Sequence, residues 1–531
     1  MKIILALILA ILAFDFSLAA VFIPSVLAGI GFIVCGTAIF YLARRKTIVT
    51  SAVGWQLGEA VELTNPDRPT TVKNAVIAPQ VLNLGLLIIG APGAGKTVSV
   101  LSYLHQLRQH TPRAGWAFFE GKGDTDIYRK AVAMGEAPEY FFSTELPGSQ
   151  SLNLFAGDAP DVLDRLTKML IGETTSTSFY SDEQRAVLAR IVPLLRRLPM
   201  PTNLRDLYVT LTVEDAAREV IHHARAAGAD PVELSLAEQW INRPQGERTK
   251  NMQGLLNRLF LFVSGGNTQR LNAYQPEIDI PAIVAGGKSL YLHMPLTDFA
   301  RDVAIALVET FGVEARKRQL GGTENLESFP LMFDDWGAFF HENFGPFSAR
   351  CRSAQMPLNF GFQSRAQLDN VSRHFSNELD DTIATKIYMR VQGEETAANA
   401  VRMLGRYETH EVGTSESNSG RDSTSLQSAQ RDRIDTRQLR ELQPGEFYVS
   451  TLQKQGELIV NPLWKLRIPE PPYTNWQNVP MPAAREHATG EGLNLWDRYL
   501  TPAQTPGSLA SNAAPAASVD LTINPGLQEA L

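Results

Sequence analysis

A glycine-rich octapeptide carries the residue types that hold the phosphates of a nucleotide. Residues 90–97 fit Gly-x-x-x-x-Gly-Lys-Ser/Thr without a mismatch, reading Gly90, Ala91, Pro92, Gly93, Ala94, Gly95, Lys96 and Thr97. Glycines at 93 and 95 let the backbone curl so that successive N–H groups face a phosphate. Lys96 would reach the β- and γ-phosphates, and the Thr97 hydroxyl would bind Mg²⁺. The spacing therefore predicts a site for ATP and Mg²⁺.

Two adjacent carboxylates follow a short apolar run at residues 329–333. Asp334 and Asp335 stand at its end, and a P-loop site needs a carboxylate at the end of a neighbouring strand. We expect Asp334 to complete the Mg²⁺ site with Thr97, and Asp335 to orient or deprotonate the attacking water. Many such ATPases carry glutamate at the second place, and aspartate is one methylene shorter. The sequence therefore does not decide whether Asp335 reaches far enough to position the attacking water.

A third apolar run, residues 357–362, ends on Gln363. A polar residue at this place beside the acidic strand often senses the γ-phosphate, and we predict this role for Gln363. The alternative is an amide that only caps its strand.

These residues need a parallel sheet to bring them together. Residues 86–89 read Leu-Leu-Ile-Ile, a composition typical of a buried parallel strand, and the P-loop and a helix over 98–108 follow. A buried strand over 288–295 and an amphipathic helix over 300–319 precede Asp334. Between these parts, residues 157–260 repeat apolar positions at helical spacing and contain few strand patterns. We predict an α/β nucleotide-binding domain over 47–156 and 261–470, with an all-α insertion over 157–260.

The amino-terminal 46 residues differ from the rest of the chain. Residues 3–43 are almost entirely apolar, and Asp15 is the only charged residue among them. The stretch is long enough for two membrane spans, and three cations follow at 44–46. This predicts a transmembrane hairpin over 1–46 with the remainder of the chain cytoplasmic. The alternative is a signal peptide ending near Ala20, followed by a single span.

Composition narrows the remaining possibilities. The 531-residue chain has a net charge of −7, which excludes a protein that coats nucleic acid through its global field. The cysteines Cys35 and Cys351 form no metal-binding or disulfide pattern. Residues 413–434 are polar and predict a mobile loop. Residues 471–531, rich in proline and alanine, predict a largely disordered tail.

The ordered set of motifs resembles the type IV coupling proteins, the TraD/TraG class of conjugation ATPases. The resemblance covers most of residues 1–470. It rests on the two spans, the P-loop, the strand ending in Asp334 and Asp335, and the segment Phe362-Gln363-Ser364-x-x-Gln367-Leu368, which is similar to the glutamine motif of that family. Residues 117–124 and 151–155 look like two further family segments but lack their prolines.

The resemblance implies a fold, partners and a location. The fold would be a RecA-like P-loop motor domain with an all-α insertion, preceded by a transmembrane helical hairpin. The chain would form a hexamer in the bacterial inner membrane, with its motor domain cytoplasmic. It would pump single-stranded DNA without sequence specificity, bound to a relaxase in the relaxosome, towards inner-membrane components of a type IV secretion system. An arginine before the glutamine strand would act on a neighbouring subunit's nucleotide; Arg352 matches best, and Arg350 is the rival.

Two other functions remain open at this stage. A chromosome-pumping translocase of the FtsK kind would share the P-loop, but such proteins carry a DNA-reading winged helix at the carboxyl terminus, where this chain has the predicted tail. A secretion-substrate receptor with little ATP turnover would fit the aspartate at position 335 and the acidic net charge.

Overall fold

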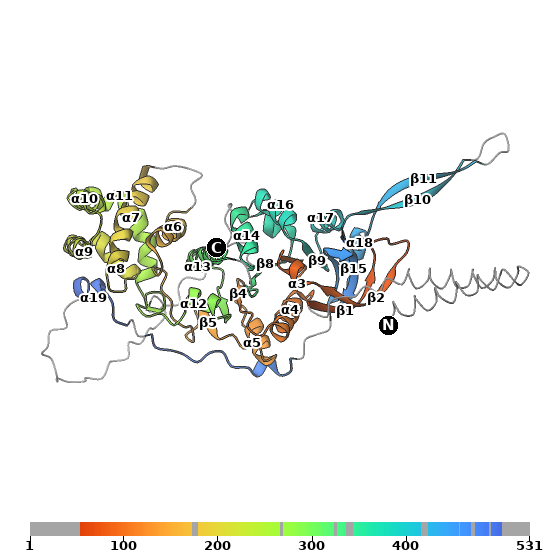
Figure 1. Cartoon of the computed structure of the whole chain (residues 1–531), viewed down its shortest axis with the longest axis horizontal. Coiled ribbons are helices and arrows are strands. Elements are labelled where there is room, and N and C mark those ends of the chain that lie inside the picture. Colours follow the sequence, from red (N-terminus) through yellow and green to blue (C-terminus); the bar gives the residue numbers. More distant parts are fainter. Residues whose placement is uncertain are drawn as a thin grey trace, which may run out of the picture.

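A large, mostly parallel sheet forms the centre of the molecule (Figure 1). The computed structural model describes residues 54–172, 179–265, 269–322, 326–335, 344–370, 372–415, 423–455, 457–468, 473–487 and 490–501. Within these residues the sheet has eleven strands in the order β2-β1-β15-β12-β9-β3-β8-β7-β4-β6-β5. Their bounds are β1 Trp55–Glu62, β2 Thr70–Ile77, β3 Leu86–Ile89, β4 Trp116–Glu120, β5 Tyr140–Ser143, β6 Ser289–His293, β7 Leu331–Asp334, β8 Leu358–Phe362, β9 Thr385–Met389, β12 Glu446–Ser450 and β15 Leu463–Arg467.

The strands from β9 to β5 pair in parallel, and the other four strands are antiparallel. Parallel strands buried on both faces need an unbroken apolar run, and all four residues of β3 are buried. Leu86 and Ile88 enter one hydrophobic core, whereas Leu87 and Ile89 enter the other. Because successive apolar side chains point to opposite faces of the sheet, helices must cover both faces. The observed sheet confirms the predicted α/β class.

Each face of the sheet has its own helices. The first core includes side chains of α4 (Lys96–His110) and α5 (Asp126–Ala133), and the second those of α13 (Asp298–Leu320), α14 (Phe344–Ser353), α16 (Arg373–Thr382) and α17 (Glu394–Leu404). Short helices complete the connections: α3 Pro79–Leu82, α12 Ile280–Ala285, α15 Arg365–Asp369 and α18 Thr436–Arg440. The P-loop and helix α4 therefore lie on one face of the sheet. Helix α13, which precedes the strand that ends in Asp334, lies on the other face.

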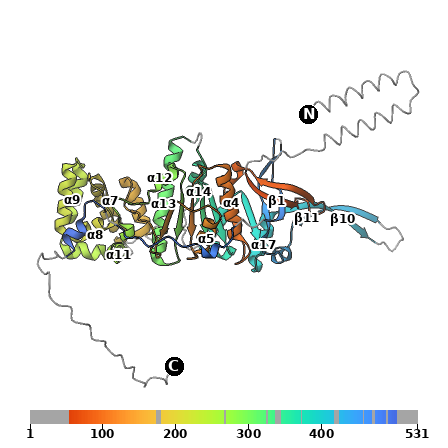
Figure 2. The ribbon, with the colours of Figure 1, turned by 90° about the horizontal axis from the view of Figure 1, so that it is seen from below.

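In the described part of the chain between β5 and α12, six helices form a separate helical part. They are α6 Ala159–Leu170, α7 Phe179–Arg197, α8 Leu204–Thr212, α9 Glu214–Ala226, α10 Pro231–Ile241 and α11 Gln245–Val263. Helix α6 packs against both α7 and α13, so it joins this helical part to the sheet. Both views place the helical part at one end of the molecule (Figure 1, Figure 2).

A ribbon of two strands projects from the opposite end (Figure 1, Figure 2). Strands β10 (Arg406–Ser415) and β11 (Ser423–Asp432) pair over ten residue positions. The prediction of a mobile loop over 413–434 is therefore wrong for the described strand residues in that range. The ribbon stands apart from the main sheet, and none of its residues at 406–410 and 428–432 is buried, so no buried face imposes an apolar alternation on these residues. A second small ribbon joins β13 (Gln453–Gln455) to β14 (Leu458–Val460).

The chain after β15 returns across the molecule to the helical part. We call residues 473–487 and 490–501, which include α19 (Leu495–Tyr499), the C-terminal strap. Lys130 of α5 lies over the Trp476 ring at 4.3 Å, and the Leu495 amide donates to Asp206 of α8 at 2.9 Å. The prediction of a largely disordered tail is wrong for this part. An extended, proline-rich chain forms no hydrogen bonds within itself, but Trp476 and Leu495 attach this one to α5 and α8. Residues 502–531 lie outside the described part of the chain.

The predicted membrane hairpin, residues 1–46, also lies outside the described residues. Among the helices that the structure describes, none has the length and apolar character needed to span a bilayer.

Candidate active site

The P-loop begins where β3 ends, at the carboxyl edge of the parallel strands. Gly93 and Gly95 have φ angles of 73° and 113°, in the left-handed region that favours glycine. Helix α4 starts directly afterwards, at Lys96, so its positive amino terminus faces the loop. The amide of Gly445 donates to the carbonyl of Ala94 at 2.9 Å, which fixes the outer wall of the loop.

Lys96 turns back into the loop. Its Nζ donates to the carbonyl of Gly90 at 2.8 Å, and 9% of the residue is exposed. Burial lowers the pKa of Lys96, while the neighbouring carboxylates of Asp334 and Asp335 raise it in opposition. The ammonium group is thus held close to both acids from the Asp-Asp strand.

Asp334 is the last residue of β7, one strand away from β3 across β8. It is 9% exposed, and its Oδ1 has no hydrogen-bond partner in the described structure. Burial, and then the nearby Asp335 carboxylate, raise the pKa of Asp334 to about 7, while Lys96 opposes the change. A buried carboxylate oxygen without a partner is costly unless a cation or a proton satisfies it.

Asp335 and Gln363 form a hydrogen-bonded pair beside Asp334. The Gln363 Nε2 donates to Asp335 Oδ2 at 2.9 Å, and the Gln363 amide donates to Gln367 Oε1 at 2.7 Å. Asp335 has a φ angle of 50°, which is uncommon for a residue with a side chain. Its other oxygen, Oδ1, has no partner among the described residues. The two glutamines and this acid form one connected chain of hydrogen bonds.

Sequence reasoning missed Glu120, a third acid at this edge. It ends β4 and lies in register with Asp334 on the neighbouring β7. Its carboxylate accepts the backbone N–H groups of Lys122 and Gly123, both at 2.9 Å. Burial, first, and the charge of Asp334 raise the pKa of Glu120 to about 7. The pattern that marks Asp334, an apolar strand ending in an acid, also occurs at residues 117–120 and would have identified this residue.

Arg352, which we predict to act on a neighbouring subunit's nucleotide, lies away from the P-loop of its own chain. The carbonyl of Arg352, near the end of α14, accepts a hydrogen bond from Asn83 Nδ2 at 3.2 Å. Asn83 precedes β3, whereas the P-loop follows it, so Arg352 lies at the opposite edge of the sheet. Its side chain is exposed. The structure therefore brings together residues 90–97, Asp334, Asp335 and Gln363, but not Arg352 of the same chain.

Comparisons with known proteins show which families and folds the chain resembles. Residues 333–444 match a family model described as the TraM recognition site of TraD and TraG. A search among curated proteins finds no match. The bacterial conjugative coupling protein TrwBdeltaN70, in its unbound monoclinic form, is 15% identical, with a TM-score of 0.50 over 75% of this chain and 88% of that chain. The plasmid coupling protein TrwB in complex with the ATP analogue ADPNP is 14% identical, with a TM-score of 0.51 over 76% of this chain and 89% of that chain.

At this level of identity the solved structures establish the fold. Together with the family model, they confirm the resemblance to the type IV coupling proteins that the motifs predicted.

Proposed function

We propose that this protein is a membrane-anchored coupling ATPase that uses Mg-ATP hydrolysis to recruit single-stranded, relaxase-bound DNA and pump it to a type IV secretion channel. The observation that carries the proposal is the meeting of Lys96, Asp334 and the Asp335–Gln363 pair at one edge of the sheet. The matched family domain and the fold of a coupling protein support the same class.

The chemistry of the donor set fits Mg-ATP. Asp334 Oδ1 is a buried oxygen without a described partner, as a carboxylate in the Mg²⁺ shell would be. Thr97 stands in the first turn of α4 and would supply a hydroxyl to the same ion. Lys96 and the backbone of residues 90–95 would hold the phosphates. When bound, Mg-ATP supplies the phosphoanhydride bond whose hydrolysis drives movement.

The residues around the γ-phosphate would divide the remaining work. Asp335 would hold the attacking water through its Oδ1, which has no partner among the described residues. Gln363 holds the other oxygen of Asp335, so a displacement of its strand would move the acid as well. Such an arrangement would couple the state of the phosphate to β8 and the helix α15 that follows it.

A hexamer would complete the site. Because Arg352 lies at the opposite edge of the sheet from the P-loop, it would act on a neighbour's nucleotide rather than on its own. Arg350 of the same helix is the alternative. The partners in this proposal are the relaxosome and inner-membrane secretion components, and the anchor is the apolar segment 1–46 in the bacterial inner membrane.

Steady-state ATPase activity of the detergent-purified full-length protein, with and without single- and double-stranded DNA, tests the proposal. We expect turnover that DNA stimulates and that is lost in Lys96→Ala. The exposed Lys454→Ala is the matched control and should behave as the wild type. Nucleotide binding without turnover under any DNA condition, in protein that still assembles, would refute the pump and favour a substrate receptor.

A further inference from the structure

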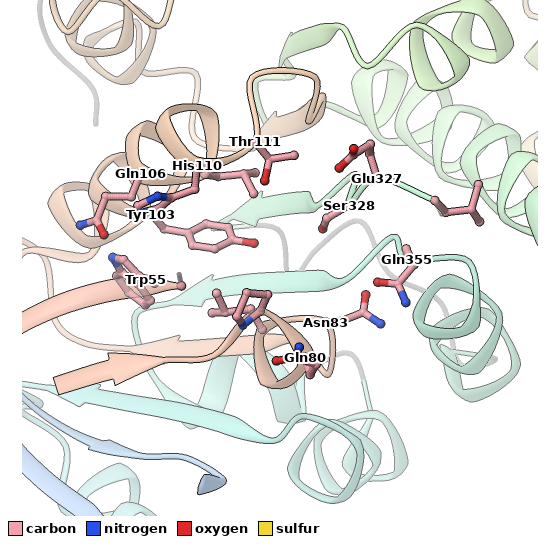
Figure 3. A pocket seen from close by; sticks show the side chains of 15 residues that line it. Trp55, Gln80, Asn83, Tyr103, Gln106, His110, Thr111, Glu327, Ser328 and Gln355 are labelled. Carbon is pink, nitrogen blue, oxygen red and sulfur yellow. The ribbon is translucent and has the colours of Figure 1, made fainter. Parts of the chain in front are cut away.

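A second cavity lies at the edge of the sheet opposite the P-loop (Figure 3). It has a volume of about 350 Å³ and is lined by fifteen residues from four places. These are the carboxyl-terminal half of α4, helix α3 with Asn83, residues 54–55, and the pair of segments formed by residues 326–328 and Gln355. A cavity of this size falls at the lower end of the range for small-molecule sites, roughly 300–1,000 Å³.

Two polar groups in this cavity lack partners. Tyr103 is 2% exposed, and Figure 3 shows its hydroxyl directed into the space between the surrounding segments. Within the residues that the structure describes, this hydroxyl makes no hydrogen bond. Asn83 donates through Nδ2 to Arg352, but its buried Oδ1 has no partner in the described structure. A buried polar atom such as Asn83 Oδ1 is nearly always satisfied in folded proteins, so it points to a ligand, and the Tyr103 hydroxyl opens on the same cavity.

Gln355 adds a backbone feature to the same cavity. Its φ angle is 57°, a conformation that side-chain-bearing residues seldom adopt. The carbonyl of Gln355 accepts from Phe329 at 2.9 Å, and its amide donates to the carbonyl of Arg352 at 3.2 Å, so both flanking peptides are held. This conformation is the left-handed cap that ends helix α14, since the N–H of Met356 also donates to the carbonyl of Cys351 at 2.8 Å. Here the conformation sets the amide side chain at the cavity margin (Figure 3).

The charge and shape of the lining define the class of ligand. None of the fifteen residues that line the cavity is lysine or arginine, and Glu327 is the one carboxylate among them. A phosphate would therefore meet neither a lysine nor an arginine, and His110 is the one basic residue in the lining. Trp55 and Tyr103 form an edge-to-face pair with ring centroids 5.6 Å apart, and the amides of Gln80, Asn83 and Gln355 surround them. Aromatic walls with amide donors and acceptors at the margin suit a flat heterocycle with polar edges.

We propose that this cavity binds a neutral nucleoside or free nucleobase, and that it is a site separate from the P-loop. The heterocycle lies between the apolar walls, and its edge groups bond to the Tyr103 hydroxyl and to Asn83 Oδ1.

Helix α4 links this cavity to the nucleotide site. The helix begins at Lys96, and Tyr103, Gln106, Leu107 and His110 line the cavity at spacings of three, four and seven residues, which is one face of a helix. Its fifteen residues span about 22 Å. A ligand in the cavity thus contacts the rigid element that carries the phosphate-binding lysine.

Ligand-observed NMR on the full-length protein tests the proposal. The probes are adenosine, guanosine, cytidine and uridine, each titrated in the presence of saturating non-hydrolysable ATP analogue and Mg²⁺, which block the P-loop. We expect saturable binding of at least one nucleoside. Tyr103→Phe, which removes only the hydroxyl, should weaken that binding roughly two- to tenfold. Gln80→Trp, at the exposed rim, should fill the opening and abolish it.

Two controls make the result decisive. Tyr128→Phe, a substitution of the same kind outside the cavity, should leave nucleoside binding unchanged. The monophosphate of the bound nucleoside should bind at least about tenfold more weakly, because its phosphate meets no lysine or arginine in the lining. The proposal is wrong if none of the four nucleosides binds, or if binding is indifferent to Tyr103→Phe or to Gln80→Trp. Equal binding of the monophosphate would overturn the neutral-ligand assignment.

Discussion

Replacing Gly361 by alanine tests the geometry around Asp334. Gly361 lies in β8, beside the end of β7, and a Cβ added there would lie 2.6 Å from Asp334 Oδ1. Carbon and oxygen atoms in contact normally stand about 3.3 Å apart, so the carboxylate must shift by roughly 0.7 Å. The affected oxygen is the one without a partner, which the proposed function assigns to Mg²⁺.

Two magnitudes follow from this displacement. The crowding should destabilise the fold by about 1–3 kcal/mol, as overpacked cores do. A misplacement approaching 1 Å at a reacting centre can reduce the rate by about 10²-fold, so we expect kcat to fall roughly 10- to 100-fold. The Mg²⁺ concentration for half-maximal activity should rise as well, because the moved oxygen is the proposed ligand.

The assay is steady-state ATPase activity titrated with Mg²⁺, together with thermal unfolding followed by circular dichroism. Gly246→Ala is the matched control, since a Cβ at that position meets no atom within 4 Å. A Gly361→Ala protein whose kcat stays within about twofold of the wild type would refute the assignment of Asp334 as a positioned Mg²⁺ ligand.

Three further predictions follow from the same structure. Because the pKa of Asp334 is raised to about 7, its carboxyl holds a proton at lower pH that Mg²⁺ must displace. The affinity for Mg²⁺ should therefore fall about tenfold per pH unit below about pH 7 and be constant above it. Affinities that calorimetry finds to be independent of pH would contradict this. Gln363→Leu removes the donor to Asp335 and should lower kcat about 10- to 100-fold with little change in the KM for ATP, whereas a change in KM alone would show a binding role. Leu495 is fully buried, so Leu495→Ala should weaken the attachment of the C-terminal strap by about 2–5 kcal/mol. In limited proteolysis the strap of this variant should be cut much faster than that of the wild type. An unchanged rate of cleavage would show that the strap does not depend on this contact.

Part of the site could be predicted because it is local in the chain. The strand, loop and helix from Leu86 to His110 are consecutive, so the apolar run, Gly93, Gly95 and Lys96 together define the phosphate cradle. Asp334 and Gln363 were also predicted, because Asp334 ends one buried strand and Gln363 directly follows another. Residues at the carboxyl ends of parallel strands share one edge of a sheet whatever the strand order.

Other features depend on which strands are neighbours. Glu120 lies beside Asp334 only because β4 pairs with β7, a pairing between segments more than 200 residues apart. Arg352 was expected to act on a neighbouring subunit's nucleotide, and only the structure shows that its helix ends beside Asn83, at the other edge of its own sheet. The spacing of these residues along the chain carries no information about which strands pair.

By itself, the sequence determined the local chemistry of this protein: the phosphate-binding loop, the strand-end acid and the glutamine, since short-range geometry follows from glycine conformations and from apolar runs. Tertiary structure alone decided the pairing that sets Glu120 beside Asp334, the return of the C-terminal strap to the helical part, the projecting ribbon and the cavity beneath α4. These features arise from long-range packing, where contacts between distant segments outweigh the preferences of any one segment.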